Sequence, residues 1–276
     1  MSQAAPSPAP PDSGPNGFQL AIEDLSIRFG GLVALENVSI GVRPGQIVAL
    51  IGPNGAGKTT VFNILSRYYQ PSGGSIRFEG ENLLRWSAHD VIRKGIARTF
   101  QNLELFRSMT VLENLLVAEH AQMRSGLIDG LFWLPRARRE EAAIRARADE
   151  TLEYLALQAY RDRPVATLPY PIQKRVELGR TLVSRPKLLL LDEPAGGLNH
   201  EELDALGRLV REIRDRWSLT ILIVEHHMNL VMGISDRVFV LDFGRLIAEG
   251  TPREVQTNPK VIEAYLGEEA VGAQAE

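Results

Sequence analysis

One glycine-rich segment constrains the fold of this chain more than any other feature of its sequence. It fits the pattern G-x-x-x-x-G-K-[ST] and comprises Gly52, Pro53, Asn54, Gly55, Ala56, Gly57, Lys58 and Thr59, followed by Thr60. The apolar run Gln46–Ile51 before it predicts a short buried strand, and a helix is predicted from Lys58 to about Tyr68. A loop of this pattern between a strand and a helix predicts a P-loop in an α/β fold.

The chemistry of this loop predicts a nucleoside triphosphate with Mg²⁺ as its ligand. The three glycines let the backbone curl so that its N–H groups point at phosphate oxygens, and the helix N-terminus adds partial positive charge. Lys58 can reach the β- and γ-phosphates, and the Thr59 hydroxyl can bind Mg²⁺. The alternative is a chance glycine-rich turn, which the flanking strand and helix disfavour.

A second apolar run, Leu188 to Leu191, ends in two carboxylates, Asp192 and Glu193. Ligands of open α/β sheets bind at the carboxyl ends of the strands, so these acids are expected beside the phosphate loop. Asp192 can hold Mg²⁺ through water, and Glu193 can orient or deprotonate an attacking water. The alternative is an acidic strand end that faces solvent, and the presence of the phosphate loop weighs against it.

Two further polar residues follow predicted strand ends. His226 comes after the strand Leu219–Val224 and could reach a γ-phosphate. Gln101 follows Arg98-Thr99-Phe100 and could sense Mg²⁺ or water. Taken alone, a lone histidine is usually structural, and a lone glutamine is only a polar loop residue.

Strands alternate with helices along the chain, which indicates an α/β protein with a parallel sheet core. The β-rich start and the helical middle suggest two lobes on that core. Further strands are expected at Leu20–Phe29, Leu32–Val42, Ser75–Glu79, Lys187–Leu191, Arg237–Leu241 and Arg245–Glu249. Further helices are expected from Thr110 toward Met123 and at Pro135–Leu157, Ile172–Ser184, His200–Trp217 and His227–Ile234.

Composition excludes several classes of protein. There are 31 Lys and Arg residues against 34 Asp and Glu, a net charge of -3, so no basic excess favours nucleic acid. The absence of cysteine excludes disulfides and thiolate metal sites. The start of the chain lacks signal-peptide features and reads as a disordered tail, and no apolar run approaches the roughly 18 residues of a membrane span. The protein is expected to be soluble or peripheral.

The order and spacing of these motifs resemble an ABC-transporter ATPase subunit over about Leu20 to Leu266. Within that family the chain is most similar to the ATP-binding subunits of branched-chain amino acid importers. The long helical stretch between His120 and Leu157 also looks like that subfamily. The segments that carry this similarity are 29–35 (FGGLVAL), 97–101 (ARTFQ), 195–199 (AGGLN), 225–228 (EHHM), 231–236 (VMGISD) and 261–267 (VIEAYLG).

The resemblance implies a role for each site residue. Phe29 would stack on adenine, with an ordinary core aromatic as the alternative. Gln101 would bind Mg²⁺ and couple the nucleotide site to a transmembrane subunit. His226 would contact the γ-phosphate, and Glu193 would be the catalytic base. ATP and Mg²⁺ would be the cofactors, and residues 52–60 would bind the nucleotide.

The resemblance also implies domain limits and partners. Residues 1–17 and 269–276 would be tails, residues 18–268 the ATPase domain, and residues about 102–185 its helical subdomain. The partners would be transmembrane permease subunits and a second ATPase subunit, identical or paralogous, closing head to tail on two ATP molecules. A solute-binding protein would take part indirectly and nucleic acid would not. The chain would lie peripherally on the cytoplasmic face of the membrane.

One segment departs from the family pattern. The family signature reads Leu-Ser-Gly-Gly-Gln, whereas the aligned residues here are Leu168-Pro169-Tyr170-Pro171-Ile172, followed by Gln173. The serine hydroxyl is absent, and Pro171 has no backbone N–H to donate. In the family the signature binds the γ-phosphate held by the opposing subunit, so this binding should be weaker here. Asn199 likewise replaces an aspartate common in the wider family.

The resemblance implies an ATPase that couples ATP hydrolysis to import of branched-chain or related amino acids, and two other functions remain open on the sequence alone. One is a soluble regulatory ABC ATPase without a membrane partner, although such proteins usually carry two fused cassettes and this chain has one phosphate loop. The other is a nucleotide-binding subunit with low turnover, because of the altered signature.

Overall fold

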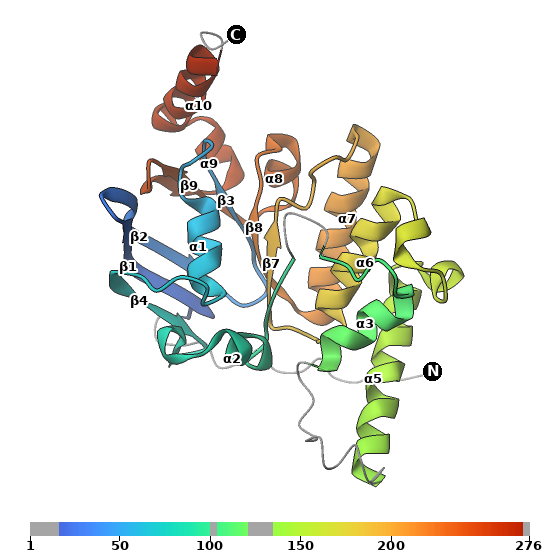
Figure 1. The fold of residues 1–276 in the computed structure, drawn as a ribbon. Helices are drawn as coiled ribbons and strands as arrows, with labels where there is room; N and C mark the ends of the chain where they lie inside the picture. The colour runs from blue at the N-terminus through green and yellow to red at the C-terminus, as the bar shows by residue number, and fades with distance from the viewer. Residues whose placement is uncertain (1–16, 100–103, 121–134, 273–276) are drawn as a thin grey trace, which may run out of the picture.

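A six-stranded sheet with the strand order β10-β9-β3-β8-β7-β6 forms the centre of the fold (Figure 1). The structure is a computed structural model that describes residues 17–99, 104–120 and 135–272. All neighbouring strands from β6 to β9 pair in parallel, and β10 pairs antiparallel with β9. The strands are β3 (Ile47–Ile51), β6 (Ile96–Arg98), β7 (Leu188–Asp192), β8 (Thr220–Val224), β9 (Arg237–Asp242) and β10 (Arg245–Gly250).

A second, antiparallel sheet is built mainly from the start of the chain, in the order β2-β1-β4-β5. Its strands are β1 (Leu20–Phe29), β2 (Leu32–Val42), β4 (Gly73–Phe78) and the short β5 (Glu81–Asn82). The bounds of β1 and β2 are those predicted. The helix α1 (Lys58–Leu65) packs with this sheet in one apolar cluster.

The central strands are apolar throughout because both faces of the six-stranded sheet are covered. In β3 every residue is buried, and Val48 and Leu50 pack with β1, β2 and α1. Ile47, Ala49 and Ile51 point to the other face and pack with helices. This alternation explains why the sequence shows an unbroken apolar run instead of a polar–apolar pattern.

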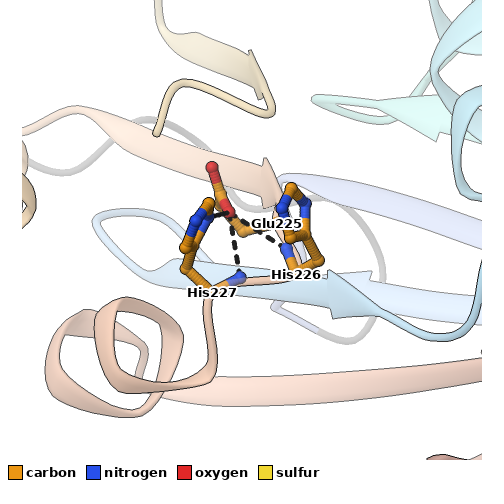
Figure 2. Close-up of side chains that lie close together, drawn as sticks. All are labelled: Glu225, His226 and His227. Atoms are coloured by element: carbon orange, nitrogen blue, oxygen red, sulfur yellow. Dashed lines mark hydrogen bonds and ion pairs between the residues drawn. The ribbon is translucent and has the colours of Figure 1, made fainter. Parts of the chain in front are cut away.

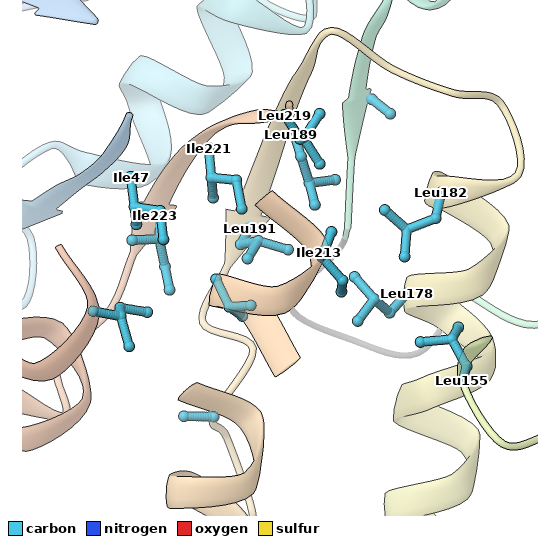
Figure 3. Packing of buried hydrophobic residues seen from close by; sticks show 14 of the residues in the cluster. Ile47, Leu155, Leu178, Leu182, Leu189, Leu191, Ile213, Leu219, Ile221 and Ile223 are labelled. Carbon is cyan, nitrogen blue, oxygen red and sulfur yellow. The ribbon is translucent and has the colours of Figure 1, made fainter. Parts of the chain in front are cut away.

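Helices α6 (Tyr170–Leu182), α7 (His200–Trp217) and α8 (Met228–Ile234) contribute to the cluster on that second face. Figure 3 shows Ile213 of α7 between sheet residues such as Leu189 and helix residues such as Leu178. The long helix α5 (Pro135–Tyr154) and α3 (Val111–His120) pack with α6 and form a helical layer beside the sheet. This layer lies in the stretch predicted as a helical subdomain, whose limits of 102–185 remain a prediction.

Several predicted bounds differ from those observed. The helix α1 ends at Leu65, before the predicted Tyr68, because Ser66 caps it and Arg67 adopts a positive φ of 62°. The helix α6 begins at Tyr170 and not at Ile172, with Pro169 as its N-cap. Pro171 fits the first turn because N–H groups there need no intrahelical acceptor. The bounds predicted for α7 are confirmed.

Some short elements were not predicted, although their sequences carried signals. Capping boxes open α2 (Ala88–Arg93), at Ser87 and Asp90, and α9 (Pro252–Gln256), at Thr251 and Glu254. The helix α10 (Pro259–Gly272) follows α9, and three short 3₁₀ turns occupy Leu83–Arg85, Gln158–Tyr160 and Val165–Thr167. None of the helices in the described ranges is both long and apolar enough to cross a bilayer.

Candidate nucleotide site

The phosphate loop follows β3 and opens α1, as predicted, and the structure requires glycine at two of its positions. Gly52 has a φ of 148° and Gly57 a φ of 105°, values that residues with a side chain rarely adopt. A Cβ at Gly52 would lie 2.1 Å from the carbonyl oxygen of Leu241, and a Cβ at Gly57 would lie 2.9 Å from that of Ala34. The strands β9 and β2 therefore approach the loop too closely for any other residue.

Lys58 lies against its own loop. Its Nζ donates hydrogen bonds to the carbonyl oxygens of Gly52 at 2.6 Å and of Pro53 at 2.8 Å, and the residue is buried. The ammonium group is therefore held at the mouth of the loop, where a phosphate would meet both its charge and the N–H groups at the start of α1. Asn54 and Gly55 are exposed, Ala56 is buried, and Thr59 and Thr60 follow in the first turn of α1.

The two predicted acids stand at the end of β7, on the same edge of the sheet as the phosphate loop. The strand β8 lies between β7 and β3, and its last residue, Val224, is in register with both Asp192 and Leu50. Asp192 is almost fully buried. The hydroxyl of Thr59 and the carboxylate of Asp192 are hard oxygen ligands of the kind Mg²⁺ prefers, so the residues present fit this ion.

The Asp192 carboxylate already has a cationic partner, Arg98 at the end of β6. The guanidinium donates to Oδ2 of Asp192 at 2.6 Å, and both side chains are about nine-tenths buried or more. Arg98 also donates to Asn63 and Ser66 at the end of α1 and lies over the ring of Phe62. It therefore ties β6, β7 and α1 together beneath the site.

Glu193 turns sharply out of the strand. Its φ is 45°, an unusual value for a residue with a side chain, and its backbone N–H donates to the carbonyl oxygen of Val224 at 2.9 Å. The carbonyl oxygen of Glu193 in turn accepts from Gly196 N–H. These bonds fix where the loop leaves the sheet edge.

His226 is exposed and follows Glu225 at the end of β8, on the same sheet edge (Figure 2). Its ring lies 4.3 Å from that of His227, measured between centroids. Three of the predicted elements, the phosphate loop, the acidic pair and His226, thus follow three adjacent strands, β3, β7 and β8. Gln101 lies outside the described residues.

Phe29 is an exposed aromatic and not a core residue. It is the last residue of β1, it is 43% exposed, and its ring contacts that of Tyr69 edge to face at 5.1 Å between centroids. The core alternative considered for this residue is therefore wrong. The role predicted for Phe29, stacking on adenine, stays a prediction that its exposure allows.

The segment after Gln101 divides between core and surface. Leu105 is buried in the helical layer, whereas Phe106 is 45 % exposed. The buried Asn114 of α3 fixes the backbone at Phe106, accepting from its N–H at 2.9 Å and donating to its carbonyl at 3.1 Å. The guanidinium of Arg180 lies over the Phe106 ring. Phe106 is thus an exposed aromatic residue on a fixed backbone.

The altered signature forms the start of α6. Backbone N–H groups of Ile172 and Gln173 donate to the Pro169 carbonyl, and the Gln173 side chain donates to Leu168. The Tyr170 hydroxyl donates to the carbonyl of Gly196. The polar groups that could replace the missing serine and glycine are therefore engaged within the chain. Asn199, the other departure, caps α7 by accepting from Glu202 N–H.

A cavity of about 300 Å³ opens between α6, α7 and the loop after β7, and its lining includes Thr99, Pro194 and Leu198. Lys58 is not part of this lining. The phosphate site is therefore defined by the backbone of its loop and the neighbouring strand ends, not by this cavity.

Two residues of the site were not predicted, Arg98 as a partner of Asp192 and Glu225 as a partner of the histidine loop. Arg98 and Asp192 are 94 residues apart in sequence, and Glu225 also accepts a hydrogen bond from Ala195, 30 residues away. The only signal in the sequence was that each ionisable residue lies next to or near a residue already singled out, Gln101 or His226.

Comparison with known proteins gives matches over most of the chain. The profile of the family "ABC transporter" matches residues 35–196, and that of the "branched-chain amino acid ATP-binding cassette transporter" matches residues 245–271. The high-affinity branched-chain amino acid transport ATP-binding protein LivG of Salmonella typhimurium is 49% identical over 249 residues, which cover 90% of this chain and 98% of LivG. The corresponding protein BraF of Pseudomonas aeruginosa is 47% identical with the same coverage.

The solved structures give the same relationship. The ADP conformation of MJ1267, an ATP-binding cassette of an ABC transporter, superposes with a TM-score of 0.79 at 33% sequence identity, covering 91% of this chain and 99% of that one. A nucleotide-free cassette superposes with a TM-score of 0.78 at 32% identity, covering 90% of this chain and 98% of that one. Together with the family profile and the identity to LivG, these matches identify the chain as a member of the ABC transporter family, and specifically as one of its ATP-binding cassettes.

Proposed function

We propose that this chain hydrolyses ATP for an ABC importer of branched-chain or related amino acids. One observation supports the ATPase activity most directly: the phosphate loop and the acidic pair follow β3 and β7, and β8 lies between these strands in register with both. The transported class is inferred from LivG and BraF, which are named as branched-chain amino acid transport proteins.

In this proposal each residue acts at a defined part of ATP. Lys58 and the N–H groups of the loop bind the β- and γ-phosphates, and Phe29 stacks on the adenine ring. Glu193 accepts a proton from the attacking water, and His226 and Gln101 contact the γ-phosphate region. Mg²⁺ bound by Thr59, Asp192 and Gln101 would neutralise phosphate charge.

The proposed partners are permease subunits and a second ATPase subunit, with the chain bound peripherally at the cytoplasmic face of the membrane. A solute-binding protein acts through the permease. The docking site proposed on this chain is the exposed ring of Phe106. Its backbone is held by Asn114, and its ring lies against the guanidinium of Arg180. A Phe106→Cys variant in the assembled complex should cross-link to the permease. Cross-links confined to this chain would place the contact elsewhere.

The function is tested by reconstituting the chain with its membrane subunits in liposomes. ATP-driven uptake of leucine, isoleucine or valine should occur with the parent chain and stop with Glu193→Gln. Hydrolysis without uptake of any amino acid would favour the soluble regulatory ATPase. Nucleotide binding with little hydrolysis would favour the low-turnover subunit, for which the engaged groups at the start of α6 are the supporting observation.

A further inference from the structure

The side chain of Glu225 joins two loops of the site. Its Oε1 accepts the backbone N–H of Ala195 at 2.8 Å, in the loop after β7. Its Oε2 accepts the backbone N–H groups of His226 at 3.0 Å and His227 at 3.1 Å, and lies 2.9 Å from Nδ1 of His227 (Figure 2). One carboxylate therefore holds the loop that follows Glu193 and the loop that contains His226.

Glu225 is fully buried, which makes these bonds a requirement. A buried carboxylate without partners is strongly unfavourable, and carboxylates in protein interiors are normally hydrogen-bonded. A carboxylate oxygen accepts, so the contact with His227 is a hydrogen bond in the tautomer that carries the proton on Nδ1. Four donors, three of them backbone N–H groups, thus converge on this side chain.

A second bond parallels this contact. The carbonyl oxygen of Val224, directly before Glu225, accepts the N–H of Glu193 at 2.9 Å. Two consecutive residues at the end of β8 therefore hold Glu193 and Ala195, two residues apart in the loop after β7. The bond between Val224 and Glu193 continues the pairing of β8 with β7. The bond between Glu225 and Ala195 comes from a side chain, so it depends on the identity of residue 225.

We propose that Glu225 is a positioning residue that fixes the loop carrying Glu193 against the loop carrying His226. It acts by keeping these two groups in one relative arrangement. The proposal rests on the proposed function, since a fixed arrangement of Glu193 and His226 matters only if both act on ATP. Displacement of a reacting group by about 1 Å can cost on the order of 100-fold in rate.

The same three residues could be taken for a metal site, because polar atoms of Glu225, His226 and His227 lie within 4.8 Å of one another. The contacts argue against this. Oε2 of Glu225 faces three N–H donors, and Nδ1 of His227 is one of them. A cation at this oxygen would have to displace donors that the buried carboxylate needs.

The informative variant is Glu225→Gln, which preserves the size of the side chain. Its amide oxygen should turn toward the three donors from His226 and His227, which leaves the NH₂ group facing the N–H of Ala195. Two donors then oppose each other, so the variant releases the loop after Glu193 and keeps the histidine loop. The control is Asp236→Asn, because Asp236 is also a carboxylate that accepts a backbone N–H, that of Ile47 at 2.7 Å, but at the end of β3 away from the phosphate loop.

The measurements use the purified full-length chain and its complex with the membrane subunits. For Glu225→Gln, kcat of ATP hydrolysis should fall about tenfold to 100-fold, while the affinity for a fluorescent ATP analogue changes less than about twofold. Asp236→Asn should lower Tm, because it weakens a hydrogen bond to β3, and should keep the parent kcat. A second variant, His227→Phe, should lower kcat with unchanged ATP affinity, and His227→Asn should recover part of the loss by supplying an amide donor.

The outcomes separate this inference from the proposed function. A parent protein that does not hydrolyse ATP contradicts the proposed function itself. If the parent is active, parent-level kcat in Glu225→Gln overturns the positioning role; should that variant not fold, parent-level kcat in His227→Phe does so. Equal loss of kcat in Asp236→Asn, or a parallel loss of ATP affinity in Glu225→Gln, also overturns it, because either result would reflect general destabilisation.

Discussion

Replacing Arg98 by methionine tests the buried ion pair with Asp192, the proposed Mg²⁺ ligand. Removing one partner of a buried pair leaves an uncompensated charge and costs about 3–5 kcal/mol. The Arg98–Asp192 pair meets that condition, because its side chains are only 10% and 4% exposed. Since each kcal/mol shifts Tm by about 2–4 °C in a domain of this size class, Tm should fall by about 6–20 °C.

The chain offers a matched control in Arg245→Met. Arg245 pairs with Glu36 at the same 2.6 Å, but its side chain is 67% exposed. An exposed pair contributes about 1 kcal/mol or less, so Tm should change by no more than about 4 °C. The double variant Arg98→Met with Asp192→Asn should recover part of the loss, because no charge then remains buried.

The assay is thermal unfolding with ATP, in the presence of Mg²⁺ or of a chelator. If Asp192 binds Mg²⁺, the ion supplies the missing positive charge, and the Tm difference between parent and Arg98→Met should shrink with Mg²⁺ but not with the chelator. Equal losses in Arg98→Met and Arg245→Met would refute the burial argument. A difference that Mg²⁺ leaves unchanged would refute the assignment of Asp192 to the metal.

Three further predictions concern the nucleotide itself. Lys58→Ala should weaken binding of a fluorescent ATP analogue at least about tenfold, because charge-assisted hydrogen bonds are worth about 1.5–3 kcal/mol each; unchanged affinity would exclude the loop as the site. Glu193→Gln should retain ATP, accumulate ATP-dependent dimers on gel filtration and lose about 100-fold or more in hydrolysis, and a parent rate would exclude this base. In a complex with a paralogous partner that bears a full signature, Glu193→Gln in this chain should abolish most ATP turnover, while the same change in the partner should leave much of it. Restoring the signature with Pro169→Ser and Pro171→Gly should then raise turnover. Equal losses from the two Glu→Gln changes would show that the two sites are equivalent.

The sequence predicted those parts of the site that local patterns determine. The phosphate loop was identified because strand, glycines and helix are contiguous, and Asp192 because it ends an unbroken apolar strand. The bounds of α7 were correct because Asn199 and Glu202 form a capping box ahead of an amphipathic helix. Each of these signals lies within a few residues of the feature that it predicts.

The partners of the charged groups could not be predicted in this way. The pairing of Arg98 with Asp192 depends on β6 lying beside β7, and the bond from Ala195 to Glu225 depends on β7 lying beside β8. Strand order is a property of the whole sheet, and nothing near Arg98 or Glu225 specifies it. The exposure of Phe29 likewise depends on what packs around the β1–β2 turn, so the sequence left the core alternative open.

The position of β8 between β3 and β7 sets the distance between the phosphate loop and the acidic pair. Neighbouring strands are about 4.8 Å apart, so the phosphate loop and the acidic pair start from points roughly 10 Å apart. Loop substitutions can move a side chain at either end, but they cannot alter this baseline, because it is set by backbone hydrogen bonds on both sides of Val224. A substrate with a much larger distance between the phosphate bound by the loop and the phosphate that reacts would therefore require a different order of strands, and not merely different loops.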